Sequence, residues 1–326
     1  MAMATSTRER EDISTFSIPQ LLALYPRERL FVHPLLWTTR HLRLVHCQFL
    51  NLGEVTITVP PAPSPPRARS TAIHDDADEV QRHLDEKQGE YSMQRRLATD
   101  PHPITRGSAL SRLLRERTYC GDRIPLSFAH RAVANLLCKT YSHRAQPSYP
   151  SLAYVDLSDI TLKRRIRLGD PSAVSYRRPN PPKYRRAQKL VRRHTPTDPF
   201  EDPYIFALFV ALAQQRRLRN KNSNEDTGIS DAITPSPPSP PLPMILLVTR
   251  PSDTTWLHIY TSNISTEMSD RFDYPSRTPP TAMPPATIYR RQLAFEPYET
   301  LQQRLAAVVD GKWQEGKWQE GCAGQI

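Results

Sequence analysis

The sequence predicts an α+β protein with a small C-terminal domain built on a three-stranded sheet, a weak N-terminal mixed fold and extensive disordered proline-rich linkers. Proline accounts for 33 of the 326 residues, about twice its ordinary share, and the prolines are clustered. Hydrophobic residues make up only 38% of the chain, so a single continuous core is not expected. Residues 200–310 instead alternate apolar helical and strand patterns, and they carry the predicted domain.

Residues 1–59 predict a mixed α/β segment. A short helix begins near Pro19, and Pro26 must end it, because proline lacks the amide donor that the next helical turn needs. Residues 60–75 are rich in proline and predict a linker. The β-prone runs of the first segment lie at residues 30–32, 42–50 and 55–59.

Residues 76–162 predict a mainly helical segment. The most regular pattern begins at Ser127, a residue type that caps helices, and places Phe128, Ala132 and Leu136 on nearly one face. A strand is predicted over residues 154–160. The following residues, 163–199, are basic and interrupted by proline, and they predict a second linker.

The C-terminal domain opens with a buried helix. Asp202 is placed to cap it, Pro203 suits its first position, and the run YIFALFVALA is apolar on almost every side. Residues 222–243 contain PSPPSPPLP and predict a disordered insert within the domain. Residues 311–326 contain a short polar duplication and predict a disordered tail.

The rest of the domain supplies three strands and two helices. Residues 244–249 and 256–260 predict a hairpin, since a short turn separates two apolar runs. A third strand is predicted over residues 287–295. Short helices are predicted over residues 263–272 and from Pro297 onward, where apolar residues recur at helical spacing.

Four stretches of this domain carry a resemblance. DPYIFALFVALAQQ, ILLVTRPSDTTWLHIYTSNIS, FDYPSR and FEPYETLQQRL resemble uncharacterised proteins of filamentous ascomycete fungi over about residues 200–310. The resemblance lies in the order of these sequence stretches, and none of them is a catalytic motif. It implies a recurring domain of unknown activity, and it assigns no site residue.

Charge is the strongest functional signal in the sequence. The chain carries 44 basic and 33 acidic residues, a formal net charge of +11. One stretch, residues 163–193, holds twelve basic residues and a single acid, Asp170. We take these twelve as the candidate nucleic-acid-binding or nuclear-localisation residues: Lys163, Arg164, Arg165, Arg167, Arg177, Arg178, Lys183, Arg185, Arg186, Lys189, Arg192 and Arg193.

This basic segment has three interpretations. Arginine pairs bidentately with phosphate and stacks on bases, so the segment can bind nucleic acid. It can instead serve only as a nuclear address or a basic tether, or it can bind an acidic protein. The sequence shows no zinc-finger spacing or other base-reading signature, so contact with the phosphate backbone is the form of binding it favours.

Other function classes are disfavoured. Four dispersed cysteines without a CxxC spacing indicate an intracellular chain, and no apolar run is long enough to span a membrane. Glycine-rich phosphate loops are absent, the histidines near Cys47 lack metal-ligand spacing, and we expect no cofactor and no metal. We therefore expect a non-enzymatic nuclear regulatory or nucleic-acid-associated protein. A scaffold module with a localisation segment is the alternative, and an enzyme of unrecognised type is a remote one.

Overall fold

The chain falls into two compact units in the computed structural model. Unit 1 contains residues 1–53, 116–250 and 258–291, and unit 2 contains residues 54–115, 251–257 and 292–326. For residues 219–226 the structure describes the helical backbone alone. The described residues are 13–55, 57, 88–89, 91–144, 150–174, 181–226, 244–279 and 282–311.

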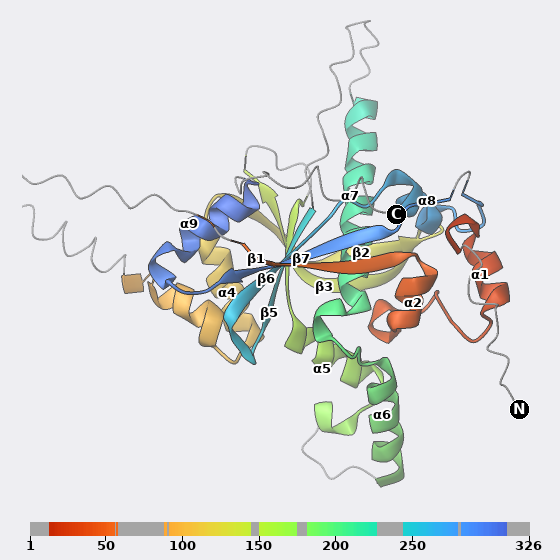
Figure 1. The fold of residues 1–326 in the computed structure, drawn as a ribbon, viewed down its shortest axis with the longest axis horizontal. Coiled ribbons are helices and arrows are strands. Elements are labelled where there is room, and N and C mark those ends of the chain that lie inside the picture. The colour runs from red at the N-terminus through yellow and green to blue at the C-terminus, as the bar shows by residue number, and fades with distance from the viewer. Residues whose placement is uncertain are drawn as a thin grey trace, which may run out of the picture. The chain divides into compact units, whose positions relative to one another are not determined.

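The described strands form a seven-stranded mixed sheet with the strand order β1-β7-β6-β5-β4-β3-β2 (Figure 1). β2, β3 and β4 pair antiparallel, whereas β4 and β5 are parallel. The strand bounds are β1 Cys47–Glu54, β2 Arg117–Phe128, β3 Arg131–His143, β4 Leu152–Asp156, β5 Met244–Arg250, β6 Asp253–Ser262 and β7 Ala286–Ala294.

The predicted fold class is therefore wrong. The three strands predicted for a small C-terminal α+β domain exist as β5, β6 and β7. They belong, however, to the seven-stranded sheet of a larger α/β fold. Its other strands come from the N-terminal segment and from the segment predicted to be helical. The physical reason lies in β5, whose residues 244–249 are all buried, so the strand needs a partner along its second edge, and β4 supplies it.

Four helices follow the predicted pattern. Ser17 caps α1, whose last residue lies two positions before Pro26, and the helices predicted after Asp202, near 263–272 and after Pro297 are confirmed. Residues 91–99 are also helical. The bounds are α1 Ile18–Leu24, α2 Thr39–Leu44, α4 Pro103–Leu113, α5 Leu157–Arg167, α6 Pro181–His194, α7 Pro203–Asp226, α8 Thr266–Asp273 and α9 Tyr298–Val309.

A β-hairpin occupies the place of the helix predicted from Ser127. β2 and β3 pair over their whole length, and the turn between them consists of Ala129 and His130, both with positive φ, 49° and 60°. Two-residue hairpin turns need this conformation, but Asn-Gly or Asp-Gly usually supplies it. Ala-His gives no such signal in the sequence, and the apolar residues of this segment also fit a helical period.

Helix α7 packs on this hairpin and forms the centre of the core of unit 1. Residues 205–213 are all buried. Near its start, the Tyr204 hydroxyl accepts a hydrogen bond of 2.6 Å from the amide of Leu137 on β3. Further along, Gln214 accepts from the amide of Ser127 at 3.0 Å and donates to its carbonyl at 2.9 Å. Polar contacts thus fix both ends of the apolar half of α7 against the two strands. No described helix has the length and apolar character needed to cross a lipid bilayer.

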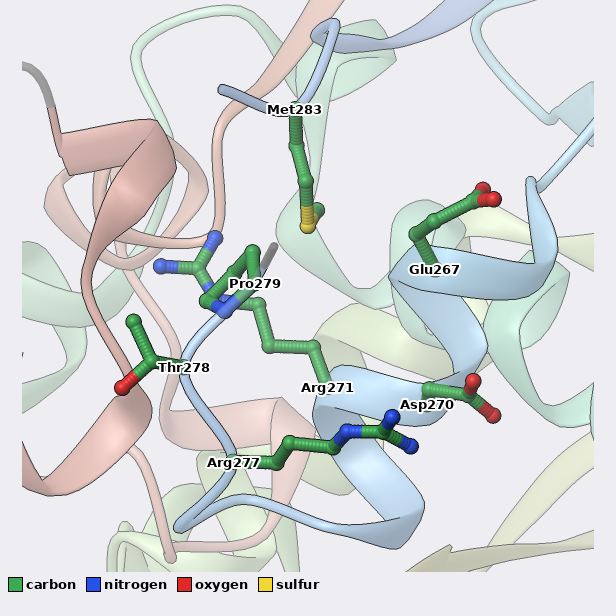
Figure 2. A pocket seen from close by; sticks show the side chains of 7 residues that line it. All are labelled: Glu267, Asp270, Arg271, Arg277, Thr278, Pro279 and Met283. Carbon is green, nitrogen blue, oxygen red and sulfur yellow. The ribbon is translucent and has the colours of Figure 1, made fainter. Parts of the chain in front are cut away.

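A buried arginine on α8 forms hydrogen bonds with the N-terminal segment, residues 13–16. Arg271 is 2% exposed, and its Nη2 donates to the carbonyls of Ile13 at 3.1 Å and Phe16 at 2.9 Å. Figure 2 shows its side chain running from α8 past Pro279, beside a hollow of about 210 Å³ that Met283 and other side chains line. Burial lowers the pKa of Arg271 to about 10, so the guanidinium stays charged at neutral pH.

We expect Arg271→Met to release residues 13–18 from α8, because methionine fills similar space but cannot donate to the two carbonyls. Limited proteolysis should then cut this segment faster than in the wild-type protein. Arg277→Met is the matched control, since Arg277 lines the same hollow and is exposed. Identical cleavage rates in all three proteins would contradict the anchoring role.

Arg304 performs a similar task in unit 2. It lies on α9, and its guanidinium donates to the carbonyls of Ala294 at 2.6 Å, Phe295 at 3.0 Å and Pro297 at 2.8 Å. The ring of Tyr298 meets that of Tyr91 edge to face, with centroids 5.8 Å apart. These contacts hold α9 to the end of β7 and to the helix over residues 91–99.

Candidate nucleic-acid interface

The structure places the basic segment on two helices of unit 1, α5 and α6, which lie next to each other (Figure 1). The Asp156 carboxylate caps α5 by accepting from the amide of Ser158 at 2.9 Å. α6 begins at Pro181, where the fixed φ of proline suits the first turn of a helix. Arg177 and Arg178 lie outside the described residues.

Two of the predicted site residues are structural. Arg164 is buried, and its Nη2 lies 2.7 Å from both carboxylate oxygens of Asp202, while its Nε donates to the Leu35 carbonyl at 2.9 Å. Arg165 donates from Nε to Asp170 at 2.7 Å and from Nη2 to Ser172 at 2.9 Å. The buried Arg164 guanidinium is therefore not available to a phosphate. Arg165, whose side chain is 35% exposed, uses two of its donors within the chain, and its part in ligand binding stays a prediction.

Five cations on α6 form one exposed surface, which we call the α6 basic face. At about 100° per residue, these positions fall within an arc of roughly 120° on the helix. All five side chains are exposed. The face consists of Arg185, Arg186, Lys189, Arg192 and Arg193.

The opposite side of α6 holds the helix in place. Ala187 is buried, and Gln188 donates to Asp170 at 3.3 Å. At the last residue of the helix, Nδ1 of His194 lies 2.8 Å from the Leu36 carbonyl. Burial alone would raise the pKa of Asp170, but hydrogen bonds from Ser172 and Arg165 lower it, so the carboxylate that receives Gln188 stays ionised. These contacts turn the apolar side inward and leave the basic face in solvent.

The charge of the α6 basic face is not compensated locally. The helix contains no aspartate or glutamate. Within the part of the chain that the structure describes, no carboxylate forms an ion pair with any of the five cations. The repulsion among five like charges along about 12 Å of helix makes this face receptive to a polyanion.

The basic face continues into a hollow of about 720 Å³ at the end of α6. We call it the arginine hollow. Its single acid, Glu28, pairs with Arg40 at 2.9 Å, which leaves the other arginines without a carboxylate among the described lining residues. Five arginines line it: Arg27, Arg29, Arg40, Arg192 and Arg193.

Two histidines, His41 and His194, also line the hollow. The Nδ1 of His41 accepts from the Thr38 amide at 3.0 Å, so the remaining proton of the neutral ring lies on Nε2, an N–H that has no partner among the described residues. Burial lowers the pKa of His41, and the Glu28 carboxylate opposes that shift only in part. The neutral ring therefore offers one buried donor beside the arginines.

Sequence reasoning missed three arginines of this hollow, Arg27, Arg29 and Arg40. They lie about 150 residues before Arg192 in the chain, in a segment interpreted only for its helix and strand pattern. The one available signal was the local density of arginine in YPRER and TTRHLR. Nothing in the sequence alone places these runs beside the end of α6.

The metal-ligand residue types near Cys47 do not form a site. His33 Nδ1 accepts from the Leu35 amide at 3.2 Å, and burial raises the pKa of the Cys47 thiol, which disfavours the thiolate that a metal would need. Among the described residues, no three His, Cys, Asp or Glu side chains gather as metal ligands would.

Comparison of the chain with protein-family models, with curated proteins and with solved structures finds no match. The resemblance of residues 200–310 to fungal proteins stays a prediction.

Proposed function

We propose that unit 1 binds nucleic acid by its phosphate backbone, through the α6 basic face and the arginine hollow. The observation that carries the proposal is the uncompensated charge: five exposed cations share one side of a helix and run into a hollow with three more arginines. Phosphate contacts by arginine and lysine release bound counter-ions, which is a strong and general source of affinity for nucleic acid.

The spacing of the cations supports a backbone contact. Arg185 and Arg193 are eight residues apart, which corresponds to about 12 Å along a helix. Duplex DNA carries one charge per about 1.7 Å of its axis, so several phosphates lie within reach of this face. Such contacts position a protein without reading bases, and we propose binding that does not depend on sequence.

Nuclear localisation and a regulatory role belong to the same proposal. A protein that binds nucleic acid by charge would act where nucleic acid is concentrated, and the α6 basic face is also exposed to an import receptor. The alternative occupant of the face is an acidic protein. The two partners differ in linear charge density, which is higher and more regular for a nucleic acid.

The test is binding of the full chain to fluorescent 20-base-pair duplexes of two unrelated sequences over a range of salt. We expect equal affinities for the two sequences and a linear fall of log K against log salt. Five to eight phosphate contacts correspond to a slope of about −5 to −7.

Polyglutamate of matched total charge serves as the acidic-protein probe in the same experiment. It should displace the duplex only at concentrations far above those of unlabelled DNA. If polyglutamate competes as well as DNA, or if the duplex does not bind at low salt, the face is not a nucleic-acid interface and the proposal fails.

A further inference from the structure

A second cationic cavity is lined by residues of α5, and we call it the α5 pocket. It has a volume of about 290 Å³ and shares no lining residue with the arginine hollow. Three cations line it: Arg123 from β2, and Lys163 and Arg167 from α5. Lys163 and Arg167 are four residues apart, a spacing that places them on the same side of the helix.

The three charges of the α5 pocket lack an anion. None of the described lining residues is an aspartate or glutamate, and none of the three cations forms an ion pair with a described carboxylate. Arg164, the neighbour of Lys163, points into the core and pairs with Asp202 instead. Three like charges around one small cavity repel one another, and a bound dianion would remove that repulsion.

Neutral groups complete the pocket. His33 accepts the Leu35 amide on Nδ1, so its neutral ring carries the proton on Nε2. Burial, helped by the charge of Arg167, lowers the pKa of His33 to about 4. At pH 7 His33 is therefore an uncharged donor, and Asn135 adds an amide that can both donate and accept.

The floor of the pocket is apolar and fixed. Leu137, Ile160 and the ring of Tyr204 contribute to it. The hydroxyl of Tyr204 is already engaged by the Leu137 amide at 2.6 Å, so the ring presents a rigid surface. An apolar floor beneath a cationic rim suits a ligand with an anionic group and a flat or apolar body, as small-molecule sites often do.

We propose that the α5 pocket binds a phosphate monoester of mononucleotide size, with its phosphate held by Arg123, Lys163 and Arg167 and its organic part on the apolar floor. A phosphate monoester carries close to two negative charges at neutral pH and three acceptor oxygens, which matches three cationic donors. A free mononucleotide and the 5′-phosphate end of a nucleic acid share this chemistry.

Calorimetric titration of the full chain with adenosine 5′-monophosphate, with adenosine and with a 5′-phosphorylated oligonucleotide tests the proposal. We expect the monophosphate to bind at least a hundredfold more tightly than adenosine. Arg123→Gln and Arg167→Gln should each weaken that binding at least tenfold. If the wild-type chain binds the 5′-phosphorylated oligonucleotide more tightly than a 5′-hydroxyl one, and the same two variants abolish that difference, the strand end is the source of the phosphate.

The matched control is Arg185→Gln with Arg186→Gln, which removes two charges of the α6 basic face and none from the α5 pocket. This variant should weaken duplex binding and leave monophosphate binding unchanged, so failure of the pocket and failure of the proposed function are separable. The inference is overturned if the monophosphate and adenosine bind alike, if neither phosphate probe binds, or if the control loses monophosphate affinity as the pocket variants do.

Discussion

Replacing Arg164 by methionine should lower the free energy of unfolding by about 3–5 kcal/mol, a large part of the 5–15 kcal/mol of a typical domain. The Arg164 and Asp202 side chains are 2% and 4% exposed, and the ion pair joins α5 to the residue that directly precedes α7. Removing the guanidinium leaves the Asp202 carboxylate buried without a counter-ion, although the Tyr204 amide still donates to it at 2.9 Å. The Leu35 carbonyl also loses its donor.

Urea titration of the single variants Arg164→Met and Asp202→Asn and of the double variant separates the pair from simple packing. Asparagine retains an oxygen that can accept from the Tyr204 amide, so the cap of α7 survives. Each single change leaves one buried side chain without its partner, whereas the double change leaves no buried charge at this position. The loss of free energy of unfolding in the double variant should therefore be well below the sum of the two single losses. Arg167→Met, exposed on the same helix, should change stability by less than about 0.5 kcal/mol. Additive losses would show that the two residues do not act as a pair.

The elements that could be predicted are those fixed by local sequence. α7 is apolar all round, β5 is a short apolar run before a turn, and the capping residues Ser17 and Asp202 mark helix starts. The pairing of β4 with β5 could not be predicted, because about 90 residues separate the two strands and parallel pairing leaves no turn signal. The β2–β3 hairpin was missed for a different reason, since its turn uses Ala129 and His130 in place of glycine or asparagine.

The candidate site was predictable in charge but not in geometry. Residues 163–193 stand out in any count of basic residues, and Lys163, Arg167 and the α6 cations are indeed exposed. The same count cannot distinguish Arg164, which is buried against Asp202, from its neighbour Lys163. The distinction depends on which side of α5 faces Asp202. Likewise, Arg27, Arg29 and Arg40 join the interface only through tertiary contact.

Replacing Arg185, Arg186, Arg192 and Arg193 together by alanine should reduce the salt slope of duplex binding by about 3.6, at about 0.9 per lost phosphate contact. The affinity at 50 mM salt should fall by several orders of magnitude. Alanine is the best helix former, and the four side chains are exposed and form no ion pair with a described carboxylate, so α6 should persist. Unchanged circular dichroism and an unchanged unfolding midpoint would verify this.

The control removes the same charge elsewhere. Arg96, Arg112, Arg131 and Arg144 are exposed and line neither the arginine hollow nor the α5 pocket, so their joint replacement by alanine should change the slope by less than about one unit. A fluorescent fusion of each variant in cells tests the nuclear part of the proposal, and only the α6 variant should leave the nucleus. If localisation changes while the wild-type chain binds no duplex, the basic segment is a nuclear localisation signal and not a nucleic-acid interface. If binding weakens with the same salt slope before and after substitution, these arginines do not meet phosphate, and the proposed function is wrong.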